Sequence, residues 1–191
     1  SMGQINPNYT FVSQYKILGP KGRITTMPAS FCPMTAAIIT NPKNGELAYI
    51  ADAFNVFNKQ GEIVIPKNKL WQDFGSNVNC GLLMDKWVNS HQIFLKVSDN
   101  RYKMFTLFFK SDLSVGSSMY VADFKFNGDL LQLVTPFKLF RSGIYDFKLF
   151  KRCREGKIFA LASIKDSNYI HQNSFQRIIF RINDSVTVID S

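Results

Sequence analysis

The 191-residue chain has room for one full-sized domain or two small ones around a hydrophobic core. Hydrophobic residues make up 46% and charged residues 19%, which excludes a mostly disordered chain, and no window approaches the ~20 apolar residues of a membrane-spanning helix. With 23 Lys and Arg against 14 Asp and Glu, the formal net charge of +9 favours polyanionic partners such as nucleic acid, an acidic membrane or an acidic protein.

The cysteine pattern bears on the cellular compartment. Cys32, Cys80 and Cys153 are widely separated and odd in number. A small secreted scaffold needs paired cysteines, so this pattern is more typical of a reducing compartment. We therefore expect an intracellular protein, either cytoplasmic or nuclear.

Most of the chain favours strands. Short runs rich in Val, Ile, Phe, Tyr and Thr recur between clusters of Gly, Asn, Asp and Ser, a pattern typical of strands joined by turns. In chain order, strands are predicted at Tyr9–Leu18, Thr35–Thr40, Glu46–Phe57, Glu62–Pro66, Ile93–Ser98, Tyr102–Lys110, Ser118–Phe126, Leu130–Thr135, Phe137–Arg141, Tyr145–Lys151, Lys157–Ile164, Gln176–Ile182 and Ser185–Asp190. Two short helices are predicted from apolar residues at helical spacing, Lys67–Phe74 and Asn79–Val88.

A short phrase occurs twice. Tyr49-Ile50-Ala51-Asp52 and Tyr120-Val121-Ala122-Asp123 begin 71 residues apart, and each is followed by a Gly-containing turn and a strand that ends in Pro. Propeller blades repeat at ~40–50 residues, so this spacing fits two related small barrels better than neighbouring blades. We predict a mainly β fold of two barrel-like units of OB or SH3-like size, 4–80 and 90–191, packed as one compact body. A small β-propeller-like fold or a β-sandwich is the alternative.

No pattern predicts a metal or a cofactor. His91 and His171 have no second His or Cys at ligand spacing. The glycines of Gly19–Arg23 lack the spacing of a phosphate-binding P-loop, and this segment is more typical of a basic turn between strands.

Two weak patterns are the available candidates for catalysis. Asp52 and Asp123 hold matching positions in the repeated phrase and are the natural pair for acid–base chemistry, but a solvent-facing carboxylate or one that accepts hydrogen bonds at a strand end explains them better. Cys153 lies among basic residues that would lower its thiol pKa, and an incidental cysteine in a basic loop is the simpler interpretation. We therefore predict a non-catalytic protein.

The most distinctive segment is basic and aromatic. Phe-Lys-Leu-Phe occurs at 137–140 and again at 147–150, on either side of Ser142-Gly143, which predicts a β-hairpin. Alternation along its strands would put cations and aromatic rings on one face. Cations that follow the phosphates and rings on which bases stack are what a single-stranded nucleic-acid platform needs. The predicted contact residues are Lys138, Phe140, Arg141, Lys148, Phe150, Lys151, Arg152 and Arg154.

The sequence thus predicts a non-catalytic binding module for RNA or single-stranded nucleic acid. The same hairpin could instead bury all of its Phe side chains and leave only the cations in solvent. The alternative function is a protein–protein adaptor that binds a partner peptide within a larger complex. Open strand edges accept peptides, and exposed aromatics beside Arg are typical of protein interfaces.

Overall fold

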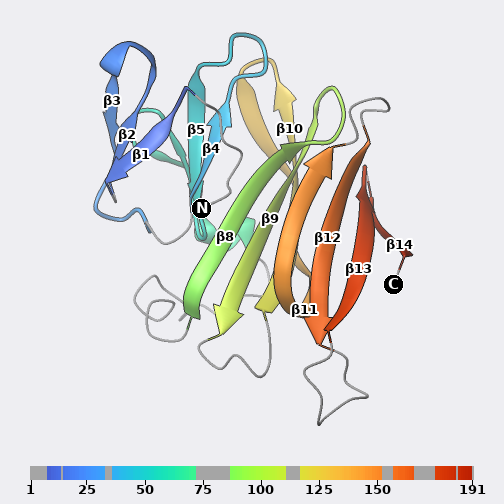
Figure 1. Cartoon of the computed structure of the whole chain (residues 1–191). Helices are drawn as coiled ribbons and strands as arrows, with labels where there is room; N and C mark the ends of the chain where they lie inside the picture. Colours follow the sequence, from blue (N-terminus) through green and yellow to red (C-terminus); the bar gives the residue numbers. More distant parts are fainter. Residues whose placement is uncertain are drawn as a thin grey trace.

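The structure is a computed structural model that describes residues 8–13, 15–32, 36–71, 87–110, 117–151, 157–165, 175–183 and 185–190. In these ranges strands predominate and form three antiparallel sheets (Figure 1). The mainly β prediction is confirmed. None of the three sheets closes into a barrel within the described ranges. Across the same ranges, no helix is long and apolar enough to cross a membrane.

Two small sheets occupy the first third of the chain. The amino-terminal sheet has the order β1 (Thr10–Ser13), β2 (Lys16–Leu18), β3 (Ile24–Thr26), with a 3-10 turn, Pro20–Gly22, between β2 and β3. The four-stranded sheet follows in chain order as β4 (Ala36–Thr40), β5 (Leu47–Asp52), β6 (Val56–Asn58) and β7 (Ile63–Ile65), and it leads into α1 (Lys67–Leu70). Of the predicted helix at Lys67–Phe74, the structure confirms the first turn, and residues 72–74 lie outside the described ranges.

The third sheet contains seven strands, each hydrogen-bonded to its sequence neighbour. Its strands are β8 (Trp87–Lys96), β9 (Arg101–Lys110), β10 (Ser117–Asn127), β11 (Leu130–Lys151), β12 (Ile158–Lys165), β13 (Phe175–Ile182) and β14 (Val186–Asp190). The predicted helix at Asn79–Val88 is wrong at its end, because Trp87 and Val88 begin β8. Its residues 79–86 lie outside the described ranges.

The predicted hairpin around Ser142-Gly143 is also wrong. Residues 130–151 form the single strand β11, which pairs with β10 as far as Ile144 and with β12 from Ile144 onward. Between the Phe124–Leu133 and Ser117–Ile144 pairs, β10 advances seven residues while β11 advances eleven, so β11 accommodates four extra residues. Extra residues in one strand of a pair bend and twist that strand. Gly143 therefore marks a bend in a long strand, with a φ of +76°, and not a reversal of the chain.

The bend in β11 lets one sheet contribute to two cores. Alternate residues of β8–β10 point to opposite faces. On one face, Phe94, Met104 and Phe124 pack against the four-stranded sheet, α1 and the first half of β11, and form the inter-sheet core. On the other face, Ile93, Phe105 and Met119 pack against the second half of β11 and β12–β14, and form the carboxy-terminal core. The layer β8–β10 is thus covered on both sides (Figure 1).

The amino-terminal sheet packs on the four-stranded sheet through a third, smaller core. Ile17 is buried there with Met27 and Phe31 against Ile38, Ile50 and Phe57. The Tyr9 hydroxyl accepts a hydrogen bond of 2.8 Å from the backbone N–H of Leu47, which ties the start of this sheet to β5.

The repeated phrase adopts two different local structures. Asp52 ends β5, and the chain reverses at once into β6. Asp123 lies in the interior of β10, which continues to Asn127 before the turn into β11. The two copies therefore share a strand conformation but differ in the position of the turn, which follows Asp52 directly and comes four residues after Asp123.

Candidate nucleic-acid interface

The bent strand β11 separates the predicted contact residues. Lys138 pairs with Val121 of β10, whereas Lys148 pairs with Leu161 of β12. Both lysines are exposed and Arg141 is half-buried. The predicted set is therefore divided between the two halves of the strand.

Phe140 does not stand on an open face. Its side chain is half-buried and packs on the carboxy-terminal core, with its ring 5.2 Å from that of Phe180 in an edge-on arrangement. Phe140 thus agrees with the alternative interpretation of the sequence, in which the Phe side chains of this segment are buried and only the cations face solvent. The side chains of Phe150 and Lys151, and the whole of Arg152 and Arg154, lie outside the described part of the structure.

The structure instead gathers cations on the outer side of β11–β13. Cross-strand pairing aligns Lys148 with Leu161 and Ile179, and it sets Phe159 opposite Arg181 and Ser163 opposite Arg177. Their sequence neighbours Ala160, Ala162, Ile178 and Phe180 point into the carboxy-terminal core. We call this surface the outer face, defined by Lys148, Phe159, Leu161, Arg177, Ile179 and Arg181.

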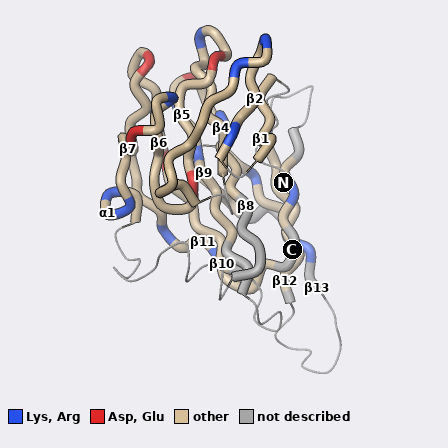
Figure 2. Tube along the Cα trace, turned by 90° about the vertical axis from the view of Figure 1, so that its left-hand side faces the viewer, with Lys and Arg blue, Asp and Glu red and all other residues tan. Residues whose placement is uncertain are grey.

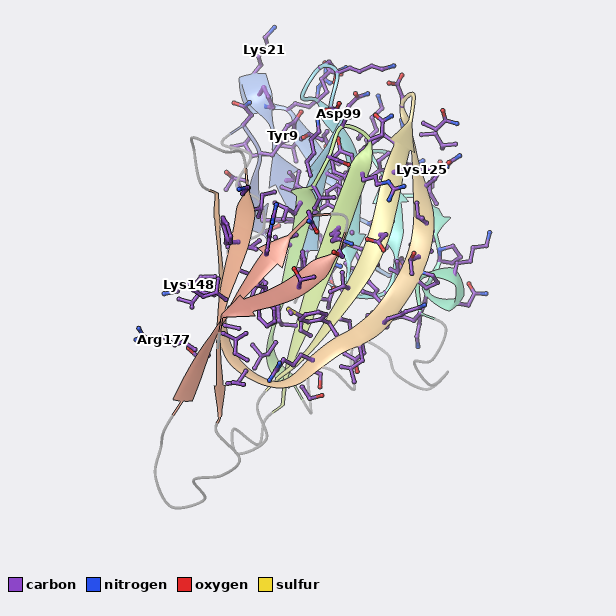
Figure 3. The ribbon with its side chains drawn as sticks, turned by 90° about the vertical axis from the view of Figure 1, so that its right-hand side faces the viewer. Tyr9, Lys21, Asp99, Lys125, Lys148 and Arg177 are labelled. Atoms are coloured by element: carbon purple, nitrogen blue, oxygen red, sulfur yellow. The ribbon has the colours of Figure 1, made fainter. Side chains whose placement is uncertain are left out.

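The outer face combines charge with partly exposed apolar groups. Lys148, Arg177 and Arg181 are exposed, while Phe159, Leu161 and Ile179 are half-buried. Lys148 and Arg177 point outward from the same side of the molecule (Figure 3). The backbone positions of Asp146 and Asp190 lie in the same cross-strand rows, opposite Ser163 and Ile179.

Of the six residues that define the outer face, Lys148 alone is among the contact residues predicted from the sequence. The other cations and the aromatic ring of this face, Arg177, Arg181 and Phe159, were not predicted. Arg177 and Arg181 are four positions apart, a spacing that places both on one face of a strand. That alternation is a signal the sequence carries. The proximity of β13 to Lys148 depends on the strand order, which no local pattern specifies.

Asp52 is buried at the turn between β5 and β6. Its carboxylate accepts hydrogen bonds from the backbone N–H groups of Cys32 at 2.8 Å, Phe54 at 2.7 Å and Asn55 at 2.7 Å. Burial raises the pKa of Asp52 from 3.8 to about 6, although the three N–H donors act in the opposite direction. The carboxylate thus closes the turn that splits the predicted strand Glu46–Phe57 in two.

The turn at Asp52 also joins two sheets. The side-chain amide of Gln92 in β8 donates a 2.8 Å hydrogen bond to the backbone carbonyl of Asp52. The indole N–H of Trp71 donates one of 2.7 Å to the carbonyl of Ala53. This geometry explains Asp52 as a structural carboxylate.

Asp123 lies on the other side of the layer β8–β10. It forms an ion pair with Lys103, a lysine of β9 whose side chain is 5% exposed. Lys103 alternates with Tyr102 and Met104, which belong to the inter-sheet core, so the ion pair is on the opposite face from Gln92 and the Asp52 turn. The two aspartates therefore do not form one site.

Cys32 is buried and disulfide-bonded. The other two cysteines of the chain, Cys80 and Cys153, lie outside the described residues. Disulfides persist mainly in oxidising compartments. The bond at Cys32 therefore argues against the reducing compartment that the cysteine count predicts.

The described residues contain no group of three or more His, Cys, Asp or Glu side chains that could hold a metal ion. Comparison with known proteins finds no match for this chain among protein-family models, curated proteins or solved structures.

Proposed function

We propose that this chain is a non-catalytic binding module for RNA or single-stranded nucleic acid, and that the outer face of β11–β13 is the contact surface. The observation that carries the proposal is the arrangement of Lys148, Arg177 and Arg181 around Phe159 on one side of a sheet. Cations on a strand surface can contact successive phosphates, and an aromatic ring among them can stack on a base. The net charge of +9 supports association with a polyanion.

The test is fluorescence anisotropy of labelled single-stranded RNA and DNA of mixed sequence, titrated with the whole chain at several salt concentrations. Three phosphate contacts predict a log–log salt slope of about −2 for single strands. Arg181→Ala should weaken binding and reduce the slope by about 0.7, because one phosphate contact is lost. Phe159→Ala should weaken binding by about 1–3 kcal/mol, because a stacked base loses its ring.

Lys138→Ala is the matched control for Lys148→Ala. Both lysines are exposed on β11, but Lys138 pairs with β10 and lies away from the outer face. Binding that falls with Lys148→Ala and is unchanged by Lys138→Ala would support the proposal. Absence of binding at low salt up to about 100 μM protein would refute it.

A protein–protein adaptor is the second candidate, and the partly exposed apolar side chains among the cations of the outer face favour it. In this case the outer face would bind an acidic peptide through the same cations, with the half-buried apolar side chains as its contact area. Binding of polyglutamate that depends on Arg181, with no binding of RNA or DNA in the same buffer, would support the adaptor and exclude the nucleic-acid module.

A further inference from the structure

A second exposed surface lies on the amino-terminal sheet, at the opposite side of the molecule from β12–β14 (Figure 1). Thr10, Leu18 and Ile24 are cross-strand partners in one row. Leu18 is 38% exposed, Ile24 57%, and Val12, at the register shift of β1, 53%. Large aliphatic side chains therefore gather in solvent on three short strands.

The other side of the same sheet is anchored to the body of the protein. Phe11, Ile17 and Thr25 form the neighbouring cross-strand row. Ile17 is 1% exposed, and the ring of Phe11 stacks on that of Phe31 at 6.4 Å. The sheet is thus held in place by one face, and the exposed aliphatic side chains belong to the face that the body leaves open.

The charged residues of the amino-terminal sheet itself all have the same sign. Lys16, Lys21 and Arg23 are the charged residues of segment 8–32, and no Asp or Glu precedes Glu46 in the chain. Lys21 is in the turn between β2 and β3, has a φ of +59° and points away from the body (Figure 3). Figure 2 shows the basic positions around β1 and β2. None of these three cations forms an ion pair with a described residue.

We propose that this face of the amino-terminal sheet, with Val12, Leu18 and Ile24 as its apolar part and Lys16, Lys21 and Arg23 as its cations, docks on an anionic lipid surface. Apolar side chains that enter the boundary of headgroups and acyl chains, together with cations that attract acidic headgroups, are the two contributions to binding at a membrane surface. A second copy of the chain fits less well, because like charges would face each other.

The position of the amino-terminal sheet is compatible with docking on a lipid surface. The three strands lie at an edge of the molecule, so their open face can approach an extended surface (Figure 1). The proposal is independent of the nucleic-acid proposal, because none of the outer-face residues belongs to this sheet.

The test is sedimentation of the whole chain with lipid vesicles, either phosphatidylcholine alone or phosphatidylcholine with 30% phosphatidylserine (about 0.3 mole fraction, chosen to give a strongly negative surface). We expect binding to the acidic vesicles that weakens with salt, and little binding to the neutral ones. Lys21→Ala should weaken binding to acidic vesicles about fivefold. Ile24→Asp should weaken it further, because it removes an apolar contact and adds a repelled charge.

Two matched controls separate this face from the rest of the surface. Ile63→Asp replaces an exposed aliphatic residue of β7, and Lys43→Ala removes an exposed lysine of the β4–β5 turn. Both should leave vesicle binding unchanged. Ile24→Asp should also leave the anisotropy of RNA unchanged, so failure of one proposal is distinguishable from failure of the other.

Failure of the chain to sediment with acidic vesicles at millimolar lipid would overturn the proposal. Equal loss of binding in Ile24→Asp and Ile63→Asp would overturn it as well, because the effect would then not belong to the amino-terminal sheet. Binding of polyglutamate that Lys21→Ala abolishes, without any binding to vesicles, would assign the face to an acidic protein instead.

Discussion

At the scale of single residues, Asp52 gives the protein a pH dependence of unusual sign. Its pKa is about 6 in the folded state and near 3.8 in an unfolded chain. Between these values the folded state binds more protons than the unfolded state, so the free energy of unfolding falls as the pH rises through this window. The stabilisation is complete below about pH 4, and the loss above pH 6 is about 3 kcal/mol for this group.

The measurement is urea unfolding of the wild type and Asp52→Asn at pH values from 4 to 7. The Asn variant lacks this titration, and the remaining carboxylates cancel in the comparison. The free energy of unfolding of the wild type minus that of the variant should therefore decrease by about 2 kcal/mol from pH 4 to pH 7, because the unfolded carboxyl is already partly ionised at pH 4. A constant difference across this range would contradict the burial of an ionisable carboxylate at the β5–β6 turn.

Two Lys–Asp pairs provide a second test at this scale. Asp123→Ala leaves the ammonium group of Lys103 buried without its partner, so we expect a loss of about 2–4 kcal/mol. Lys43 and Asp129 also form an ion pair, but both side chains are mostly exposed, at 66% and 73%. Lys43→Ala should leave stability unchanged, because water and salt screen such a pair. Thermal unfolding of both variants measures this difference, and an equal loss of stability in Asp123→Ala and Lys43→Ala would contradict the burial of Lys103.

At the scale of secondary-structure elements, the long strand β11 depends on a glycine. Gly143 has a φ of +76°, a conformation that L-residues with a Cβ rarely adopt, and an added Cβ would meet no atom within 4 Å. Gly143→Ala should therefore cost about 1–2 kcal/mol from backbone strain alone. Ser142→Ala, at the neighbouring exposed position, should cost much less. Chemical unfolding of both variants tests this, and a neutral Gly143→Ala would show that the bend of β11 does not need a left-handed residue.

The same strand shows why the contact residues predicted from the sequence do not all lie on one face. Repetition of Phe-Lys-Leu-Phe around Ser142-Gly143 is typical of a hairpin. In the structure, however, β11 contains extra residues relative to β10, and Gly143 lies at a bend within this strand. The bend carries Phe140 onto the carboxy-terminal core and leaves Lys148 beside β12. Strand alternation alone does not predict this outcome, because each register shift reverses which side chains point inward.

At the scale of the whole molecule, the inter-sheet core predicts a single cooperative unfolding transition. Trp71, next to α1, stacks on Phe137 of β11 at 4.3 Å, and Gln92 of β8 binds the Asp52 turn. Because these contacts cross between the predicted units 4–80 and 90–191, neither should unfold alone. Tryptophan fluorescence and far-ultraviolet circular dichroism should report the same midpoint. Phe137→Ala should reduce the free energy of unfolding by about 3–5 kcal/mol and therefore lower the midpoint for both probes. Two separate transitions would show that the units are independent.

Local composition and periodicity were sufficient to predict the strand-rich class and the positions of most strands. Strands such as β4 and β9 agree with their predicted ranges within a few residues, because β-branched and aromatic runs between turn residues specify an extended chain locally. The turn at Asp52 was not predicted, because the sequence does not distinguish a carboxylate that accepts hydrogen bonds within a buried turn from any other polar residue at the end of a strand.

The amino-acid sequence was enough to establish the β class, the basic charge and the cation-rich carboxy-terminal segment, because these properties depend on composition and on neighbouring residues. The tertiary structure was needed to show that β11 is one bent strand, that Asp52 and Asp123 lie on opposite faces of a layer, and that Lys148 shares the outer face with Arg177 and Arg181. The physical reason is that strand order, register shifts and burial are settled by contacts between residues far apart in the chain.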